Sequence, residues 1–193
     1  HNVAVGYQAG LSVTTGVQNT LMGSRAGDAL TDADYNVAIG NEALSTDTLG
    51  SRNTAVGYVA LANQNFTTAT DSYNTAVGYY AGNAITTGTD NTILGAIAGD
   101  ALTTGARNTA LGYHALGGDD VGNRTVAIGF ATLSTQNFST STDTYNTAVG
   151  YAAGSSITTG TLNTFVGGLA GDGTDDGSNN TAVGYLALTA NCS

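Results

Sequence analysis

The chain has 193 residues, of which 28 are glycine, and it contains no proline, no tryptophan and only four basic side chains, all arginine. Fourteen acidic residues give a formal net charge of −10, which argues against nucleic acid or an anionic membrane surface as partner, because both attract basic patches. No apolar run approaches the roughly 20 residues that span a bilayer, so membrane insertion is not predicted either.

The first predicted element lies in residues 2–10, NVAVGYQAG, and almost the same nine letters return at 74–82 and 146–154. The glycine that follows VAV or TAV recurs in steps of 17 residues, except for steps of 21 at two places. Three steps of 17 residues and one of 21 make a larger period of 72 residues. The eleven glycines are Gly6, Gly23, Gly40, Gly57, Gly78, Gly95, Gly112, Gly129, Gly150, Gly167 and Gly184.

A fixed unit of this length predicts a solenoid. TAVG or VAIG is a short β-strand, the following Ala-Gly or Ala-Leu is a corner, and TTG at 86–88 or 158–160 is a second corner. Glycine and small polar residues interrupt every helical window, and a propeller blade needs more residues than 17. We therefore predict an all-β fold, a parallel β-solenoid (β-roll) of about eleven 17-residue coils with a four-residue insertion every fourth coil.

The coils form one repetitive segment, residues 1–193, without a linker. Because the segment begins one residue before a unit and ends inside another, we interpret it as cut from a longer chain. Its single cysteine, Cys192, has no partner for an intrachain disulfide.

An asparagine begins nearly every unit, and Thr125 begins the remaining one. Stacked at one corner, these side chains predict an amide ladder that bonds along the rod and to the turn backbone. The ladder residues are Asn2, Asn19, Asn36, Asn53, Asn74, Asn91, Asn108, Asn146, Asn163 and Asn180.

Strand side chains alternate between two faces, so one face enters the core and the other points outward. We expect the valine or isoleucine of the strand to lie in the core, which leaves its alanine outside as a candidate oligomer seam. A small outward face without a partner is the alternative. The alanines concerned are Ala4, Ala38, Ala55, Ala76, Ala110, Ala148 and Ala182.

The two long units, 61–73 and 133–145, are expected to protrude from the rod. Their polar and aromatic residues suit contact with a glycan or receptor, and Asn65 and Asn137 begin N-glycosylation sequons. The alternative is a purely structural loop with its phenylalanine in the core. The candidate residues are Asn65, Phe66, Tyr73, Asn137, Phe138 and Tyr145.

Other chemistry is weakly indicated. Asp172, Asp175 and Asp176 gather carboxylates in a glycine-rich turn, where calcium finds ligands, but the pattern favours plain solvated turns. His114 occupies a position that varies freely among the units, so no catalytic group and no cofactor are predicted. Paired threonines also raise the alternative of an ice-binding solenoid.

The phrase NTAVGYxAG or NTALGYxAL, followed by TTG, resembles the repeats of bacteriophage tail fibres and related trimeric surface fibres. It is more distantly similar to the head repeats of trimeric autotransporter adhesins. The resemblance implies a homotrimeric, extracellular, non-enzymatic fibre segment on a virion or cell surface that mediates attachment to a cell surface, with a surface glycan as partner. The main alternative is a subunit of a self-assembling extracellular filament with glycans on its projecting loops.

Overall fold

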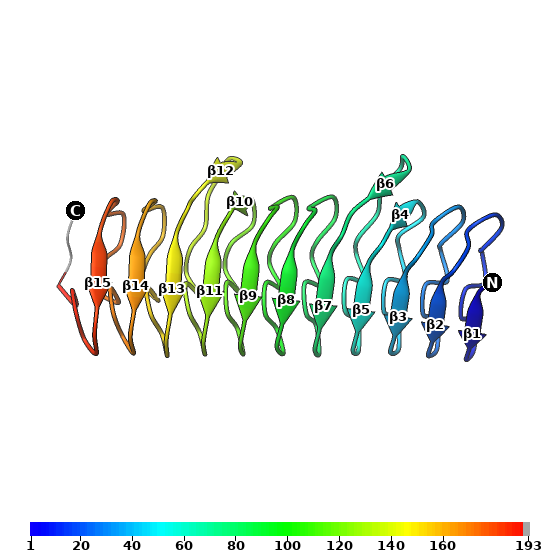
Figure 1. Cartoon of the computed structure of the whole chain (residues 1–193), viewed down its shortest axis with the longest axis horizontal. Coiled ribbons are helices and arrows are strands. Elements are labelled where there is room, and N and C mark those ends of the chain that lie inside the picture. Colours follow the sequence, from blue (N-terminus) through cyan, green and yellow to red (C-terminus); the bar gives the residue numbers. More distant parts are fainter. Residues whose placement is uncertain (191–193) are drawn as a thin grey trace.

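The computed structural model describes residues 1–190; Cys192 lies outside them. Eleven three-residue strands, one per coil, stack into a single parallel sheet that runs the length of the rod (Figure 1). This confirms the predicted all-β parallel solenoid of 17-residue coils. In sheet order the strands are β1 (Val3–Val5), β2 (Thr20–Met22), β3 (Val37–Ile39), β5 (Thr54–Val56), β7 (Thr75–Val77), β8 (Thr92–Leu94), β9 (Thr109–Leu111), β11 (Val126–Ile128), β13 (Thr147–Val149), β14 (Thr164–Val166) and β15 (Thr181–Val183).

The longer coils do not disturb this sheet. Ala55 pairs with Ala76 across a 21-residue step just as Ala38 pairs with Ala55 across 17. The additional residues leave the rod at another side, where β4 (Gly50–Ser51) pairs with β6 (Thr70–Asp71) and β10 (Gly122–Asn123) pairs with β12 (Thr142–Asp143). Figure 1 shows β6 and β12 projecting beyond the other coils.

The strand alanines are buried, so the predicted alanine seam is wrong. Ala38, Ala55, Ala76, Ala110 and Ala148 have no exposed surface, whereas the residues beside them in each strand point outward. Ala182 is likewise buried, and only Ala4, in the first coil, is exposed.

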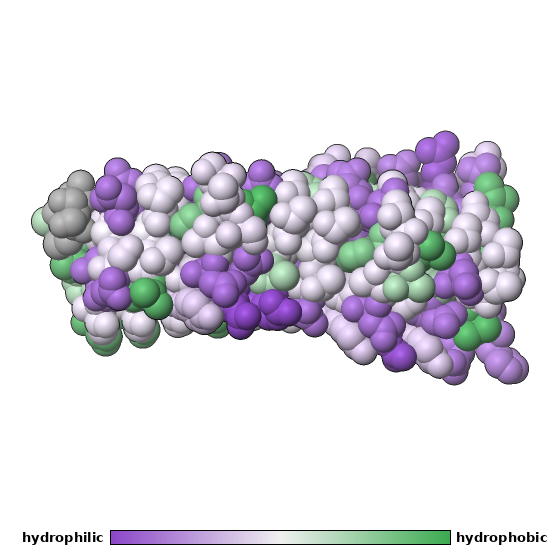
Figure 2. Space-filling model, turned by 90° about the horizontal axis from the view of Figure 1, so that it is seen from above, coloured by the Kyte–Doolittle hydropathy of each residue, from purple (hydrophilic) through white to green (hydrophobic). Residues whose placement is uncertain are grey.

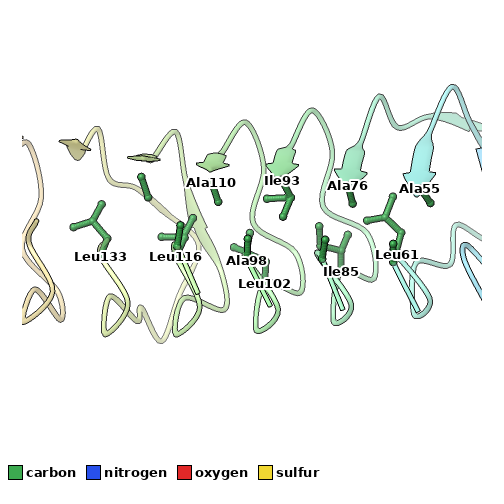
Figure 3. Packing of buried hydrophobic residues seen from close by; sticks show 14 of the residues in the cluster. Ala55, Leu61, Ala76, Ile85, Ile93, Ala98, Leu102, Ala110, Leu116 and Leu133 are labelled. Carbon is green, nitrogen blue, oxygen red and sulfur yellow. The ribbon is translucent and has the colours of Figure 1, made fainter. Parts of the chain in front are cut away.

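The interior of the coil is narrow, so a large strand residue and a large corner residue do not occur in the same coil. Leucine and isoleucine side chains from the opposite wall, such as Leu61, Ile85 and Leu116, already fill it (Figure 3). A small residue therefore fits on the strand side, and the bulkier valine turns to the outside.

The same space limit explains the 72-residue period. Where the corner residue is glycine in two successive coils, the strand of the second coil carries a large core residue in place of alanine: a Cβ on Gly99 would lie 3.0 Å from Cδ1 of Ile93. Where the corner residue is leucine, as at Leu116, the strand of that coil has alanine, at Ala110. The large strand residues recur 72 residues apart, at Leu21, Ile93 and Phe165.

Each coil bends at residues with positive φ. In coil 91–107 these are Gly95 (φ 141°), Ile97 (φ 47°), Gly99 (φ 52°) and Arg107 (φ 60°). Gly95 is required for space as well, because a Cβ there would overlap the carbonyl oxygen of Gly112 in the next coil. Within residues 1–190 there is no helix long and apolar enough to cross a membrane.

Candidate functional site

The asparagine column lies at one buried corner and joins each coil to the next. The Nδ2 group of Asn91 donates to the carbonyl oxygen of Gly105 (2.9 Å), which closes its own coil, and to Oδ1 of Asn74 (3.2 Å). Its Oδ1 accepts from the backbone N–H of Asn108 (3.0 Å). One amide thus satisfies two backbone groups and one side chain, which is the ladder that the spacing predicts.

Most members of the column make the same bonds. Nδ2 closes the coil onto the carbonyl oxygen 14 residues later at Asn2, Asn19, Asn36, Asn74, Asn108, Asn146 and Asn163. Asn53 begins a long coil, and its Nδ2 bonds Oδ1 of Asn36 (3.1 Å). Asn180 receives the last rung, because its N–H donates to Oδ1 of Asn163 (2.9 Å).

Thr125 interrupts the ladder and is compensated locally. Its backbone N–H donates to Oδ1 of Asn108 in the preceding coil (2.9 Å). Its side chain has no amide for the following coil, and the N–H of Asn146 donates to Oγ1 of Thr144 (3.2 Å) instead. The two threonine hydroxyls bond each other at 2.7 Å. Thr144 belongs to the longer coil, so the insertion supplies the replacement group.

A buried polar network anchors each long coil, and sequence reasoning missed it. Gln64 donates to Oδ2 of Asp47 (2.6 Å) and accepts from Asn74 (2.8 Å), while Oδ1 of Asp47 accepts from the N–H groups of Gly50 and Phe66. Both Asp47 and Gln64 have no exposed surface. The available signal was recurrence, since the same aspartate and glutamine return 72 residues later at the second long coil.

The second long coil repeats the network. Gln136 donates to Oδ2 of Asp119 (2.6 Å) and accepts from Asn146 (2.8 Å). Burial raises the pKa of Asp119, and the hydrogen bond from Gln136 lowers it in part. Burial likewise raises the pKa of Asp28 and Asp100; in both carboxylates Oδ1 is buried without a hydrogen-bond partner.

The six loop candidates divide into two groups. Phe66 and Phe138 are buried beneath the insertions, which supports the alternative that they belong to the core. Tyr73, Tyr145 and Asn137 are exposed, and Asn65 is half-buried with its Oδ1 accepting from Thr48 (3.3 Å).

An exposed charged cluster accompanies each insertion. The Nε of Arg52 bonds Oδ2 of Asp71 at 2.9 Å, and the guanidinium lies 4.7 Å from the ring centre of Tyr35 and 5.9 Å from that of Tyr73. Its pKa is raised, mainly by the hydrogen bond to Asp71. At the second long coil Arg124, the last residue of the preceding coil, bonds Asp143 at 3.1 Å and lies 5.6 Å from the ring centre of Tyr145. Each insertion therefore brings arginine, carboxylate and phenol together.

The outer face of the sheet carries two columns without a single charged residue. The first, here the outer threonine column, contains Val3, Thr20, Val37, Thr54, Thr75, Thr92, Thr109, Val126, Thr147, Thr164 and Thr181. The second, here the outer aliphatic column, contains Val5, Met22, Ile39, Val56, Val77, Leu94, Leu111, Ile128, Val149, Val166 and Val183. All eleven members of the second column are apolar and at least partly exposed, Leu94 by 43%.

A third exposed column follows the bend at the glycine. Tyr58 stacks on Tyr79 with ring centres 5.5 Å apart, and Phe130 stacks between Tyr113 and Tyr151 at 5.3 Å from each. Sequence reasoning missed this column, although an aromatic residue follows the glycine in most units.

The calcium candidates do not converge. Among residues 1–190 no three histidine, cysteine or acidic side chains come together in a group able to hold a metal, so Asp172, Asp175 and Asp176 remain separate. Oδ1 of Asp175 instead accepts from the hydroxyl of Thr158 (2.7 Å). The described part of the chain also encloses no pocket.

Comparison of the chain with protein-family models, with curated proteins and with solved structures finds no match in any of the three.

Proposed function

We propose that this chain is a structural and adhesive segment of an extracellular fibre, a non-enzymatic shaft that associates with copies of itself through the outer face of its sheet. The observation that carries the proposal is the outer aliphatic column, eleven apolar side chains in one uninterrupted row. A monomeric protein rarely leaves such a row in water.

A second copy of the chain is the partner that this face fits. Its side chains recur every ~4.8 Å, the spacing of neighbouring strands, and another copy offers the same spacing over the same length. The face carries no charge although the chain has a net charge of −10, so no like charges are brought together within the contact. By contrast, the side of the rod seen in Figure 2 shows polar residues with only small, separate hydrophobic patches.

The size of the face is sufficient for association. Eleven strands make a row on the order of 50 Å long and a three-residue strand is about 10 Å wide, which gives about 500 Å² per copy. Two such faces together reach roughly the 1,000 Å² that marks a specific interface. Because Leu94 and Leu111 are exposed side chains outside the core, replacing them leaves the core intact.

Light scattering of the purified chain tests this proposal. We expect a mass of three chains, in agreement with the trimeric fibres that the repeats resemble. The double variant Leu94→Arg and Leu111→Arg should give the mass of one chain. The control, Thr87→Arg and Thr104→Arg, adds the same charge at exposed corner positions of adjacent coils and should keep the wild-type mass.

The outcomes separate the two forms of assembly. A wild-type chain that remains monomeric overturns the proposal. A heterogeneous species of high mass, dissolved by the Leu94 and Leu111 substitutions but not by the control, supports the filament instead of the trimer.

The adhesive part of the proposal belongs to the two long coils. Each supplies the aspartate and tyrosine of an Arg–Asp–Tyr cluster, whose arginine ends the preceding coil, and guanidinium, carboxylate and phenol groups offer the donors and acceptors that bind sugar hydroxyls. The two clusters are four coils, or roughly 19 Å, apart. A glycan array on which the wild-type chain binds, and the Arg52→Ala and Arg124→Ala double variant does not, would support adhesion; a blank array for the wild type removes it.

A further inference from the structure

The tyrosines at the first long coil come closer together than any others in residues 1–190. Tyr58 and Tyr79 follow the bend glycines of successive coils, and their rings stack with centres 5.5 Å apart and planes inclined by 12°. Tyr80 completes the group, at 4.6 Å from Tyr79 and 5.7 Å from Tyr58. Tyr58 and Tyr79 are exposed, so an oxidant in solution reaches them.

A sugar ring binds by lying on an open aromatic face. The stack of Tyr58 on Tyr79 covers one face of each ring and so reduces the platform that these rings offer to a sugar. The close grouping of three phenols therefore either has a chemical role or serves only to stabilise the contact between coils.

We infer that Tyr58, Tyr79 and Tyr80 form a site of oxidative dityrosine cross-linking between successive coils, with hydrogen peroxide and a haem peroxidase as the oxidant. This inference does not rest on self-association, because the phenols belong to one chain. The peroxidase takes one electron and one proton from each of two phenols and reduces the peroxide to two molecules of water. The two phenoxyl radicals join through ring carbons beside the oxygen, and each joined carbon returns its hydrogen to the phenol oxygen.

Proximity selects this pair of coils. Two radicals held in contact combine far more readily than radicals that must meet by diffusion, and the exposed side chains need only change rotamer to bring the ring carbons together. The link would join the long coil 53–73 to the coil that follows it. In a solenoid each coil is held only by its neighbours, so one covalent bond at this step prevents the two coils from separating.

The second aromatic stack of the same column supplies a natural control. Tyr113 and Tyr151 occupy the same place in their coils, but Phe130 lies between them. Phenylalanine has no phenol to oxidise, so neither tyrosine has a coupling partner within contact distance.

The experiment treats the purified chain with a haem peroxidase and hydrogen peroxide, and then measures dityrosine fluorescence and the mass of the chain. Chymotryptic peptides, which separate residues 58 and 79 by cleavage at Leu61, locate the link. We expect the chain to lose two hydrogen atoms and a peptide to join Tyr58 to Tyr79 or Tyr80. The Tyr79→Phe and Tyr80→Phe double variant should lose that product, and the Tyr113→Phe and Tyr151→Phe variant should keep it.

The same treatment of the Leu94→Arg and Leu111→Arg variant shows whether the link forms within one chain, and we expect it to persist there. Absence of the cross-linked peptide from the wild type overturns the inference. So does a product in which Tyr113 or Tyr151 is linked as often as Tyr58.

Discussion

Replacing Asn91 with alanine tests whether the buried amide column stabilises the solenoid. Asn91 is fully buried in the middle of the rod. The substitution leaves two backbone groups without partners, the carbonyl oxygen of Gly105 and the N–H of Asn108. Each buried orphan costs about 1–3 kcal/mol, so we expect the free energy of unfolding to fall by roughly 2–6 kcal/mol.

Asn2 provides the matched control. It makes the same two bonds, to the carbonyl oxygen of Gly16 (2.8 Å) and from the N–H of Asn19 (2.8 Å), but it is exposed. Water can replace its amide, so Asn2→Ala should lower the free energy of unfolding by less than about 1 kcal/mol.

Urea unfolding followed by circular dichroism, at one protein concentration, measures both variants. Hydrogen exchange at the Asn108 amide adds a local measurement, because this N–H loses its acceptor only in Asn91→Ala and should then exchange faster. Equal costs for the two variants would refute the argument that burial of the amide, rather than the bond itself, sets the magnitude. So would unchanged exchange at Asn108.

Four further predictions concern the bends and the buried carboxylate. Gly95→Ala places a Cβ against the backbone of the next coil at φ 141° and should cost roughly 3 kcal/mol or more in thermal unfolding, whereas Gly168→Ala, whose Cβ would meet nothing closer than 3.5 Å, should be nearly neutral. Ile97 holds a β-branched side chain at φ 47°, so Ile97→Asn should raise the free energy of unfolding by about 1 kcal/mol; a loss would show that its packing outweighs the strain. Burial raises the pKa of Asp119 in the folded chain, so protonation of this carboxyl stabilises the fold fully below the unfolded pKa of about 3.9, and this stabilisation is lost as the pH rises through the folded pKa. The difference in unfolding free energy between wild type and Asp119→Asn should therefore shrink over that range. A difference that grows with pH would contradict a raised pKa. In Asp119→Asn the new amide N–H donors face the N–H donors of Gln136, which lose their acceptor. Adding Gln136→Glu should restore stability, because the amide at position 119 then donates to the new carboxylate.

Coil length and the position of the strand could be predicted because glycine recurs for a geometric reason. At Gly95 only a residue without a side chain fits against the coil above, so the spacing of such glycines measures the length of one coil directly. The asparagine spacing is informative in the same way, since a side chain that must reach the carbonyl 14 residues later tolerates little change.

Which face of the strand enters the core was predicted wrongly, because hydrophobicity alone does not give the width of the interior. Valine is more apolar than alanine, but Leu61 and Leu116 leave room only for a small residue opposite them. The discriminating signal was Ile93: the column that holds alanine almost everywhere has a large residue only in coils whose corner residue is glycine, so this column must lie opposite that corner. The glutamine network was missed because a polar residue in a polar loop gives no sign of burial.

Features that repeat in every coil and features that occur only once or twice along the rod differ in what they can contribute to binding. A contact made by the outer aliphatic column is offered eleven times along the rod, so it can strengthen association but cannot mark one place on the surface. The Arg–Asp–Tyr clusters occur twice, at the only coils that project within residues 1–190, and the three tyrosines in mutual contact occur once there. The proposed recognition of a ligand would therefore fall to the exceptional coils, and the buried Asp–Gln networks beneath them hold those loops in a fixed position.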